Sequence, residues 1–237
     1  MCAIGWRVAL DAGVMMQPKR LPSAGIGMTS ARTRERLVQR LRAQGIRNEA
    51  VLERFRALPR HLFVDEALAT RAYEDNALPI GFGQTISHPY VVARMTEALL
   101  EHAPRKILEI GTGCGYQTAV LSPLVISIYS IERISALLDK TKLRFKELQL
   151  RNVTVRHGDG FKGWPAHAPY DAIIMAAAPE LMPRVLLDQL SPNGGRLIAP
   201  IGPDGRQELV RITRKGDELQ TERLGIVSFV PLVKGLG

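Results

Sequence analysis

Apolar residues recur with helical spacing in the first part of the chain. Between residues 29 and 58 they return every three or four positions, as on one face of an amphipathic helix. Side chains suited to cap a helix precede each run, and residues that end helices follow it. The pattern predicts one helix from Thr29 or Ser30 to Gly45 and a second from Asn48 to Pro59.

The pattern changes after a further expected helix, Val91 to Leu100. Apolar runs of strand length then alternate with helix-like stretches. We expect strands at 106–110, 127–131, 153–157, 171–176, 195–201, 207–213 and near 224–230, and helices at 116–122, 134–149 and 180–190. This alternation is typical of a doubly wound, mostly parallel sheet with helices on both faces, an α/β fold. Lys215-Gly216-Asp217 predicts a hairpin and an antiparallel edge.

In residues 61–89 the apolar positions follow neither the helical nor the strand spacing, and the segment contains several prolines and glycines. An irregular segment of that length inside a compact protein usually has a function.

The length of 237 residues fits a single α/β domain. Residues 1–27 differ from the rest, because Arg7 and Asp11 interrupt their only apolar stretch and prolines and glycines follow. We expect 1–27 to be a disordered leader, or the start to be assigned too early, with Met28 as the true first residue. Residues 28–237 then form one domain, in which 28–100 is a helical extension with the long irregular segment and 101–237 is the α/β core.

Composition narrows the class of protein. Hydrophobic residues make up 46% and charged residues 23%, and no apolar run approaches the roughly 20 residues of a membrane helix. The net charge of +9 could favour nucleic acid, but the basic residues mingle with Glu, which favours solvated helix faces. Cys2 and Cys114 make no disulfide framework, so we expect a cytoplasmic protein, and the five histidines lack paired ligand spacing, so we expect no metal.

Three glycines at alternate positions follow the apolar run 106–110. Gly111, Gly113 and Gly115 let backbone approach a ligand closely and adopt positive φ without strain. Glu132 comes 21 residues after Gly111 and can accept hydrogen bonds from both ribose hydroxyls. The alternative is an ordinary strand-to-helix turn with incidental glycines.

The spacing Gly-x-Gly-x-Gly, with Glu109 two residues earlier, resembles the first motif of class I S-adenosylmethionine-dependent methyltransferases. The resemblance implies S-adenosyl-L-methionine as cofactor, in a Rossmann-like fold. The residues implied in cofactor binding in this part of the chain are Glu109, Gly111, Thr112, Gly113, Gly115 and Glu132.

Two further strand ends bear on the ligand. Asp159, followed by Gly160, can accept from the adenine amine, and its register with Gly111 and Glu132 favours this role over the alternative of an ordinary Asp-Gly turn. Ala176-Ala177-Ala178-Pro179 offers neither a polar acceptor nor an aromatic ring for a flipped base. This stretch argues against methylation of exocyclic amines in nucleic acid.

A closer resemblance rests on Gly-Gln-Thr-Ile-Ser-His-Pro-Tyr at 83–90, the glycine loop, Arg-His-Gly-Asp-Gly at 156–160 and Phe-Val-Pro-Leu-Val-Lys-Gly at 229–235. Together they resemble the bacterial protein-L-isoaspartate (D-aspartate) O-methyltransferases, from about Met28 to Gly235. His88 stands where Gln is common in the family, and Cys114 where Ser is common. Neither residue is needed for the family's reaction.

The resemblance implies methyl transfer to the free α-carboxylate of L-isoaspartyl and D-aspartyl residues in age-damaged proteins and peptides. The ester then collapses to a succinimide, which begins repair. Because a carboxylate is already ionised at neutral pH, no general base is required. The resemblance marks Ser87 as the active-site residue, with Thr85, Ile86 and His88 beside the substrate, whereas spacing alone would equally allow Ser87 to cap a helix.

Two other classes remain open from the residues. An RNA or small-molecule methyltransferase could share the fold, and a binding protein could keep the cofactor pocket without catalysis. Intact Ser87, Glu132 and Asp159 argue against the second. We expect isoaspartyl proteins and peptides as partners, no nucleic acid, no membrane, and a monomer.

Overall fold

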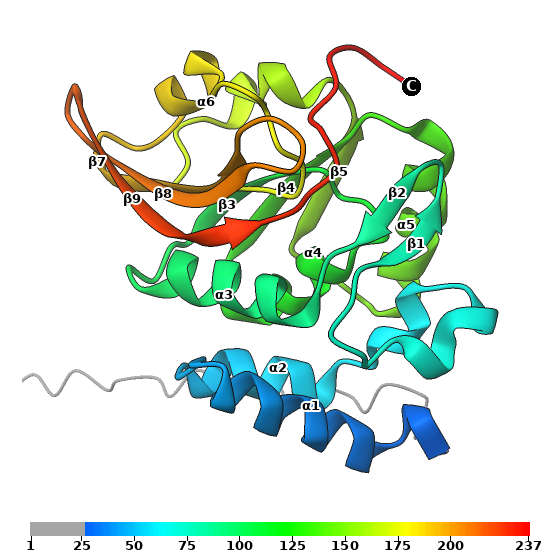
Figure 1. The fold of residues 1–237 in the computed structure, drawn as a ribbon. Coiled ribbons are helices and arrows are strands. Elements are labelled where there is room, and N and C mark those ends of the chain that lie inside the picture. Colours follow the sequence, from blue (N-terminus) through cyan, green and yellow to red (C-terminus); the bar gives the residue numbers. More distant parts are fainter. Residues whose placement is uncertain (1–26) are drawn as a thin grey trace, which may run out of the picture.

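A computed structural model describes residues 27–237. Apart from Gly27, the leader expected over 1–27 lies outside the described residues. A seven-stranded sheet forms the centre of the molecule (Figure 1). Its strands are β3 (Lys106–Ile110), β4 (Ser127–Glu132), β5 (Val153–His157), β6 (Ala172–Met175), β7 (Asn193–Ile201), β8 (Gln207–Lys215) and β9 (Glu218–Val227), in the order β5-β4-β3-β6-β7-β8-β9.

The strands from β5 to β7 are parallel, and β8 and β9 add an antiparallel edge. The expected fold class, a mostly parallel doubly wound sheet with an antiparallel edge, is therefore confirmed. Continuous apolar runs suit these central strands, because helices cover both of their faces. β3, for example, is buried along four of its five residues.

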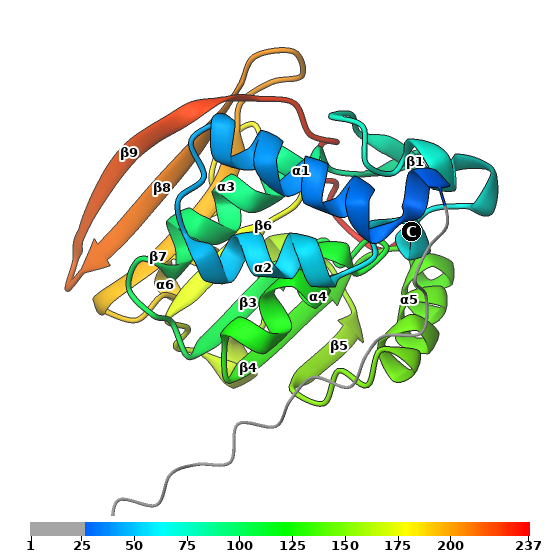
Figure 2. The same ribbon diagram turned by 90° about the horizontal axis from the view of Figure 1, so that it is seen from below.

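The helices form layers on the two faces of the sheet. Their bounds are α1 (Ala31–Ala43), α2 (Glu49–Ala57), α3 (Pro89–Leu100), α4 (Tyr116–Leu121), α5 (Ser135–Glu147) and α6 (Arg184–Asp188). α3 and α4 lie under one face, and α1 and α2 form a further layer beneath α3, as the view from below also shows (Figure 2). α6 lies on the opposite face (Figure 1), and α5 packs beside β4 and β5.

The two N-terminal helices begin where the sequence predicts. The side chain of Ser30 accepts a hydrogen bond from the backbone N–H of Thr33, and that of Asn48 accepts from two backbone N–H groups of the first turn of α2. The apolar faces of α1 and α2 join the same buried cluster as β1, β2 and α4. The N-terminal helices therefore support the segment that precedes α3.

That segment, 61–89, is more regular than predicted. It contains the 3-10 helices η2 (Arg60–Phe63) and η3 (Glu66–Arg71) and a hairpin of β1 (Leu78–Gly81) and β2 (Gln84–Ile86). The hairpin is too short, and too rich in glycine and proline, to show an alternating pattern. Shorter 3-10 turns elsewhere are η1 (Gly27–Thr29), η4 (Ser122–Leu124), η5 (Gly160–Lys162) and η6 (Pro165–His167).

Two further element boundaries differ from the prediction. The helix expected at 180–190 is confined to Arg184–Asp188, because Pro183 disfavours helical backbone in the residue before it. The last strand runs over Glu218–Val227 rather than near 224–230, because the hairpin turns back directly after Lys215. The residues after 227 leave this sheet and cross its carboxyl edge, where Pro231 forms an isolated bridge with Ala178.

The chain order reverses at β3, which has β4 on one side and β6 on the other. Parallel sheets bind ligands outside the carboxyl ends of the strands at such a switch point. Here the backbone leaves β3 at Gly111 and β6 at Ala176, and a Cβ on Gly111 would lie 3.5 Å from the Cβ of Ala176.

Candidate active site

The loop after β3 needs its glycines. Gly111, Gly113 and Gly115 have φ of +89°, +55° and +84°, a region that residues with a Cβ rarely adopt. A Cβ on Gly115 would lie 2.3 Å from a ring carbon of Phe145, so α5 packs directly on this loop. The loop thus presents bare backbone at the switch point.

Glu132 is fixed beside this loop at the end of β4. Its Oε2 accepts from the backbone N–H of Gly113 at 2.9 Å, and its Oε1 accepts from that of Ile134 at 3.0 Å. The hydroxyl of Thr141 donates to the carbonyl of Gly113 at 2.7 Å. The Glu132 carboxylate is thereby held in one position while each oxygen keeps accepting capacity toward a ligand.

A cleft opens at this point and encloses about 840 Å³, including solvent at its mouth. It is bounded by the β1–β2 hairpin and the residues after it, the glycine loop, the ends of β4 and β6, and the C-terminal segment. Polar groups from segments far apart in sequence therefore face one cleft.

Most residues predicted for the site line this cleft. Those that do are Thr85, Ile86, Ser87, Gly111, Thr112, Gly113, Glu132 and Gly160. Four predicted residues are not among the lining residues: His88, Glu109, Gly115 and Asp159.

Sequence reasoning missed other lining residues, including Gln117, Arg133 and the stretch 230–233. The motif at 229–235 was visible in the sequence, but nothing in its spacing placed it over the cleft. Gln117 follows the glycine loop and is oriented by Thr96, whose hydroxyl accepts from its Nε2 at 2.9 Å.

Glu109 is buried on β3 and has no exposed surface. Its Oε2 accepts from the hydroxyls of Thr118 and Ser130, each at 2.5 Å, and its Oε1 has no partner. Burial, with a smaller contribution from the nearby Glu132, raises the pKa of Glu109 to about 7 against these two hydrogen bonds. Ser130 also hydrogen-bonds Thr112, a lining residue, at 2.7 Å. Glu109 is therefore linked to the cleft through other residues.

The Asp159 carboxylate accepts hydrogen bonds from two separate backbone segments. Its Oδ1 accepts from the N–H of Phe161 at 2.9 Å, and its Oδ2 accepts from the N–H of Gly235 at 3.0 Å. The Asp159-Gly160 turn, the alternative interpretation of this stretch, is therefore present. The same carboxylate also holds the C-terminal segment. Contact between Asp159 and adenine stays a prediction.

Ser87 is half-buried and lines the cleft. It does not cap α3, which begins at Pro89 with His88 at the cap position and no side-chain cap hydrogen bond. The carbonyl of Ser87 accepts from Nη2 of the buried Arg60 at 2.8 Å. The Ser87 backbone is thus held by the buried Arg60, and the Ser87 side chain is not used to cap the helix.

A family model described as protein-L-isoaspartate(D-aspartate) O-methyltransferase (PCMT) matches residues 32–237 of the chain. The chain belongs to this family. A protein-L-isoaspartate O-methyltransferase of Halorhodospira halophila is 58% identical over 214 residues, which cover 90% of this chain and 97% of the relative. One from Marinobacter nauticus is 58% identical over 212 residues, covering 90% and 96%.

Solved structures of the family share the fold. One protein-L-isoaspartate O-methyltransferase superimposes with a TM-score of 0.77 at 28% identity, covering 86% of this chain and 67% of its own. A Plasmodium falciparum structure described with the same activity, in complex with S-adenosyl-L-homocysteine, has a TM-score of 0.75 at 26% identity and covers 85% and 99%.

Proposed function

We propose that this chain transfers the methyl group of S-adenosyl-L-methionine to the free α-carboxylate of L-isoaspartyl and D-aspartyl residues in proteins and peptides. The observation that carries the proposal is that Ser87 and Glu132, 45 positions apart, line one cleft with the glycine loop between them in sequence. Family membership gives the reaction, and the cleft supplies residues suited to both substrates. The product, a methyl ester beside a peptide amide, begins repair by closing to a succinimide.

The residues of the cleft fit the cofactor. Bare backbone at Gly111 and Gly113 allows close approach, and the Glu132 carboxylate is an acceptor suited to two ribose hydroxyls. When bound, S-adenosylmethionine supplies an electrophilic methyl group on a positively charged sulfur. The family structure solved with S-adenosyl-L-homocysteine supports this cofactor.

Ser87 would act on the substrate carboxylate by orienting it. The carboxylate is ionised at neutral pH, so the site needs no group to remove a proton. A serine hydroxyl can donate to one carboxylate oxygen and hold the other in line for attack, and orientation of this kind can contribute several kcal/mol. Thr85 and Ile86 line the cleft on the same segment, and His88 follows Ser87, so we assign all three to the peptide side.

The decisive assay compares two peptides that are identical except for one isoaspartyl or aspartyl linkage. Labelled methyl from S-adenosylmethionine is expected on the isoaspartyl peptide alone, as a base-labile ester. Label on neither peptide, with cofactor binding intact, contradicts the proposal and returns RNA and small acids as candidates.

Ser87→Ala is expected to lower turnover by about 10- to 100-fold, because a hydrogen bond to a charged group contributes roughly 1.5–3 kcal/mol. The affinity for S-adenosyl-L-homocysteine, measured by calorimetry, should change less than about twofold. Ser191→Ala, at a half-buried serine in the turn before β7, is the matched control and should leave turnover unchanged. Wild-type turnover in Ser87→Ala removes Ser87 from the mechanism.

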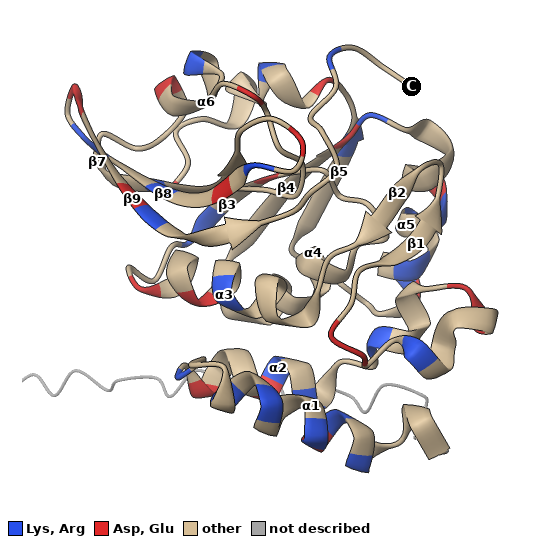
Figure 3. Ribbon diagram, viewed as in Figure 1, with Lys and Arg blue, Asp and Glu red and all other residues tan. Residues whose placement is uncertain are grey.

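The setting of the enzyme is also part of the proposal. Within 27–237 no helix combines the length and apolar character needed to cross a membrane. The buried thiol of Cys114 is free, which supports a reducing cytoplasm. Basic and acidic segments occur together on most helices and outer strands, with basic ones predominant on α1 (Figure 3), and we propose that the chain does not bind nucleic acid. The absence of tight RNA binding at physiological salt and a monomeric mass in light scattering are the expected results.

A further inference from the structure

Arg60 is an arginine with no exposed surface at the start of η2. Its Nε donates to the carbonyl of Ala72 at 2.8 Å, and its Nη2 donates to the carbonyl of Ser87 at 2.8 Å. The guanidinium carbon lies 4.9 Å from the centre of the Tyr116 ring. Two segments of the N-terminal extension and one helix of the core therefore converge on a single side chain.

The positive charge of Arg60 lacks a carboxylate partner. Among residues 27–237, none of the ion pairs includes Arg60, and its Nη1 is buried without a hydrogen-bond partner. A buried charge is costly unless it is paired. Two carbonyls and the face of an aromatic ring offset part of this cost, and a full negative charge would offset more. Arginine stays protonated despite burial, which lowers its pKa from a very high value.

Two contacts of Arg60 also line the cleft. Ser87, whose carbonyl it holds, and Tyr116, whose ring it faces, are both lining residues, whereas Arg60 itself is not. The uncompensated charge thus lies one layer of residues away from the cleft. Charges interact more strongly across buried protein than across water, so an anion in the cleft would experience this charge.

We propose that Arg60 is the positioning residue for the substrate: it fixes the Ser87 peptide group, and its charge attracts the α-carboxylate of the isoaspartyl residue. The inference rests on the proposed function, because it requires a carboxylate in the cleft. The substrate anion supplies the negative charge that the described residues around Arg60 do not. Selection for a free α-carboxylate is then partly electrostatic.

The test uses a pair of isoaspartyl peptides, one with the free α-carboxylate and one with the α-carboxamide. Both are bound to the full-length enzyme saturated with S-adenosyl-L-homocysteine, and the ratio of the two dissociation constants is measured by calorimetry. Arg60→Gln, which removes the charge, is expected to reduce the carboxylate preference at least tenfold and to raise KM for the peptide more than it lowers kcat. The affinity for S-adenosyl-L-homocysteine should stay within twofold of wild type.

Arg60→Lys keeps the charge but cannot bridge both carbonyls with one planar fork. It is expected to keep the carboxylate preference and to lose turnover, because the Ser87 peptide is held less firmly. If Arg60→Gln does not fold, Arg60→Lys alone tests whether the charge at this position gives the carboxylate preference. Loss of the preference in Arg60→Lys would show that charge is not the cause.

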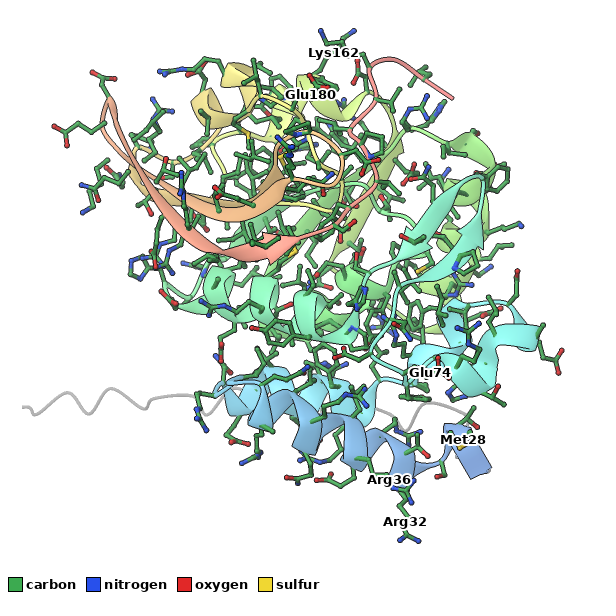
Figure 4. All side chains as sticks on the ribbon, viewed as in Figure 1. Met28, Arg32, Arg36, Glu74, Lys162 and Glu180 are labelled. Atoms are coloured by element: carbon green, nitrogen blue, oxygen red, sulfur yellow. The ribbon has the colours of Figure 1, made fainter. Side chains whose placement is uncertain are left out.

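Arg36→Gln is the control for net charge, because the exposed Arg36 side chain extends outward from α1 (Figure 4). It should leave the preference unchanged. An unchanged preference in folded Arg60→Gln overturns the proposal and leaves Arg60 a structural residue. Failure of the wild-type enzyme to methylate the isoaspartyl peptide would instead contradict the proposed function, which the peptide-pair assay reports separately.

Discussion

Glu109 and Glu132 are buried carboxylates on adjacent strands with opposite surroundings. Glu132 accepts from two backbone N–H groups, one with each oxygen, and it faces the cleft. Glu109 accepts from two hydroxyls with one oxygen and has no partner for the other. The same residue type therefore lines the cleft at one position and is enclosed as a titrating group at the other.

The raised pKa of Glu109 predicts a pH dependence of stability. The folded chain holds this proton up to about pH 7, whereas the unfolded chain releases it near the ordinary glutamate pKa of 4.5. Between these values the unfolded state binds fewer protons, so the free energy of unfolding falls as pH rises. The loss is at most about 3 kcal/mol, at 1.36 kcal/mol per pKa unit.

Urea unfolding at several pH values from about 4 to about 8 measures this dependence. Glu109→Gln, which cannot ionise, should flatten the curve in that range, while Glu218→Gln at an exposed position should not. Equal slopes for wild type and Glu109→Gln would show that Glu109 is not the titrating group.

The turn from β3 into α4 is the element on which the site depends. Its glycines have two separate reasons for lacking a Cβ: positive φ at all three, and direct contact with α5 at Gly115. A glycine elsewhere in the chain has positive φ without the close contact, so a comparison with it separates the two effects. Gly205, between β7 and β8, also has positive φ (+74°), but a Cβ there would meet nothing within 4 Å.

Gly115→Ala is expected to destabilise the protein by at least about 2 kcal/mol more than Gly205→Ala. Both variants carry the left-handed backbone penalty of roughly 1–2 kcal/mol, and only Gly115→Ala adds a clash with Phe145 and Thr141. Urea unfolding gives both values. Equal destabilisation would mean that α5 moves away from the loop at little cost.

At the scale of the whole molecule, the C-terminal segment closes the site. The backbone N–H of Leu232 donates to the carbonyl of Ala178 at 2.8 Å, and the N–H of Gly235 donates to Asp159. Residues 230–233 then line the cleft beside the glycine loop. The end of the chain thus forms part of a site whose other parts begin at residue 80.

Removal of residues 231–237 is expected to weaken S-adenosyl-L-homocysteine binding at least about tenfold in calorimetry, because burying apolar ligand surface contributes roughly 25 cal/mol per Å². Unfolding should stay cooperative, since Phe229 and its hydrogen bonds to Gln207 are kept. Leu236→Ala, at an exposed position of the same segment, is the control and should have little effect. Unchanged binding in the longer truncation would show that the segment is not part of the cofactor site.

The sequence by itself determined the α/β class, the central strands and the glycine loop, because these follow from local patterns: apolar runs of strand length and glycines at fixed spacing. It also identified Ser87 and Glu132, since each lies in a motif at a strand end or loop. The place of Glu132 in the cleft follows from the carboxyl edge of a parallel sheet, which the alternation of strands and helices already predicts. Ser87 follows β2 of the separate antiparallel hairpin, so only the tertiary structure brings it to that edge.

Only the tertiary structure decided which way side chains of the same motifs face. Glu109 points into a buried hydroxyl network, Asp159 holds the C-terminal segment, and Arg60 anchors Ser87. The contacts of Glu109 with Ser130, of Asp159 with Gly235 and of Arg60 with Ser87 each join residues at least 21 positions apart in sequence. Such contacts leave no periodic signal in the chain, because they depend on how the elements pack and not on the order of neighbouring residues.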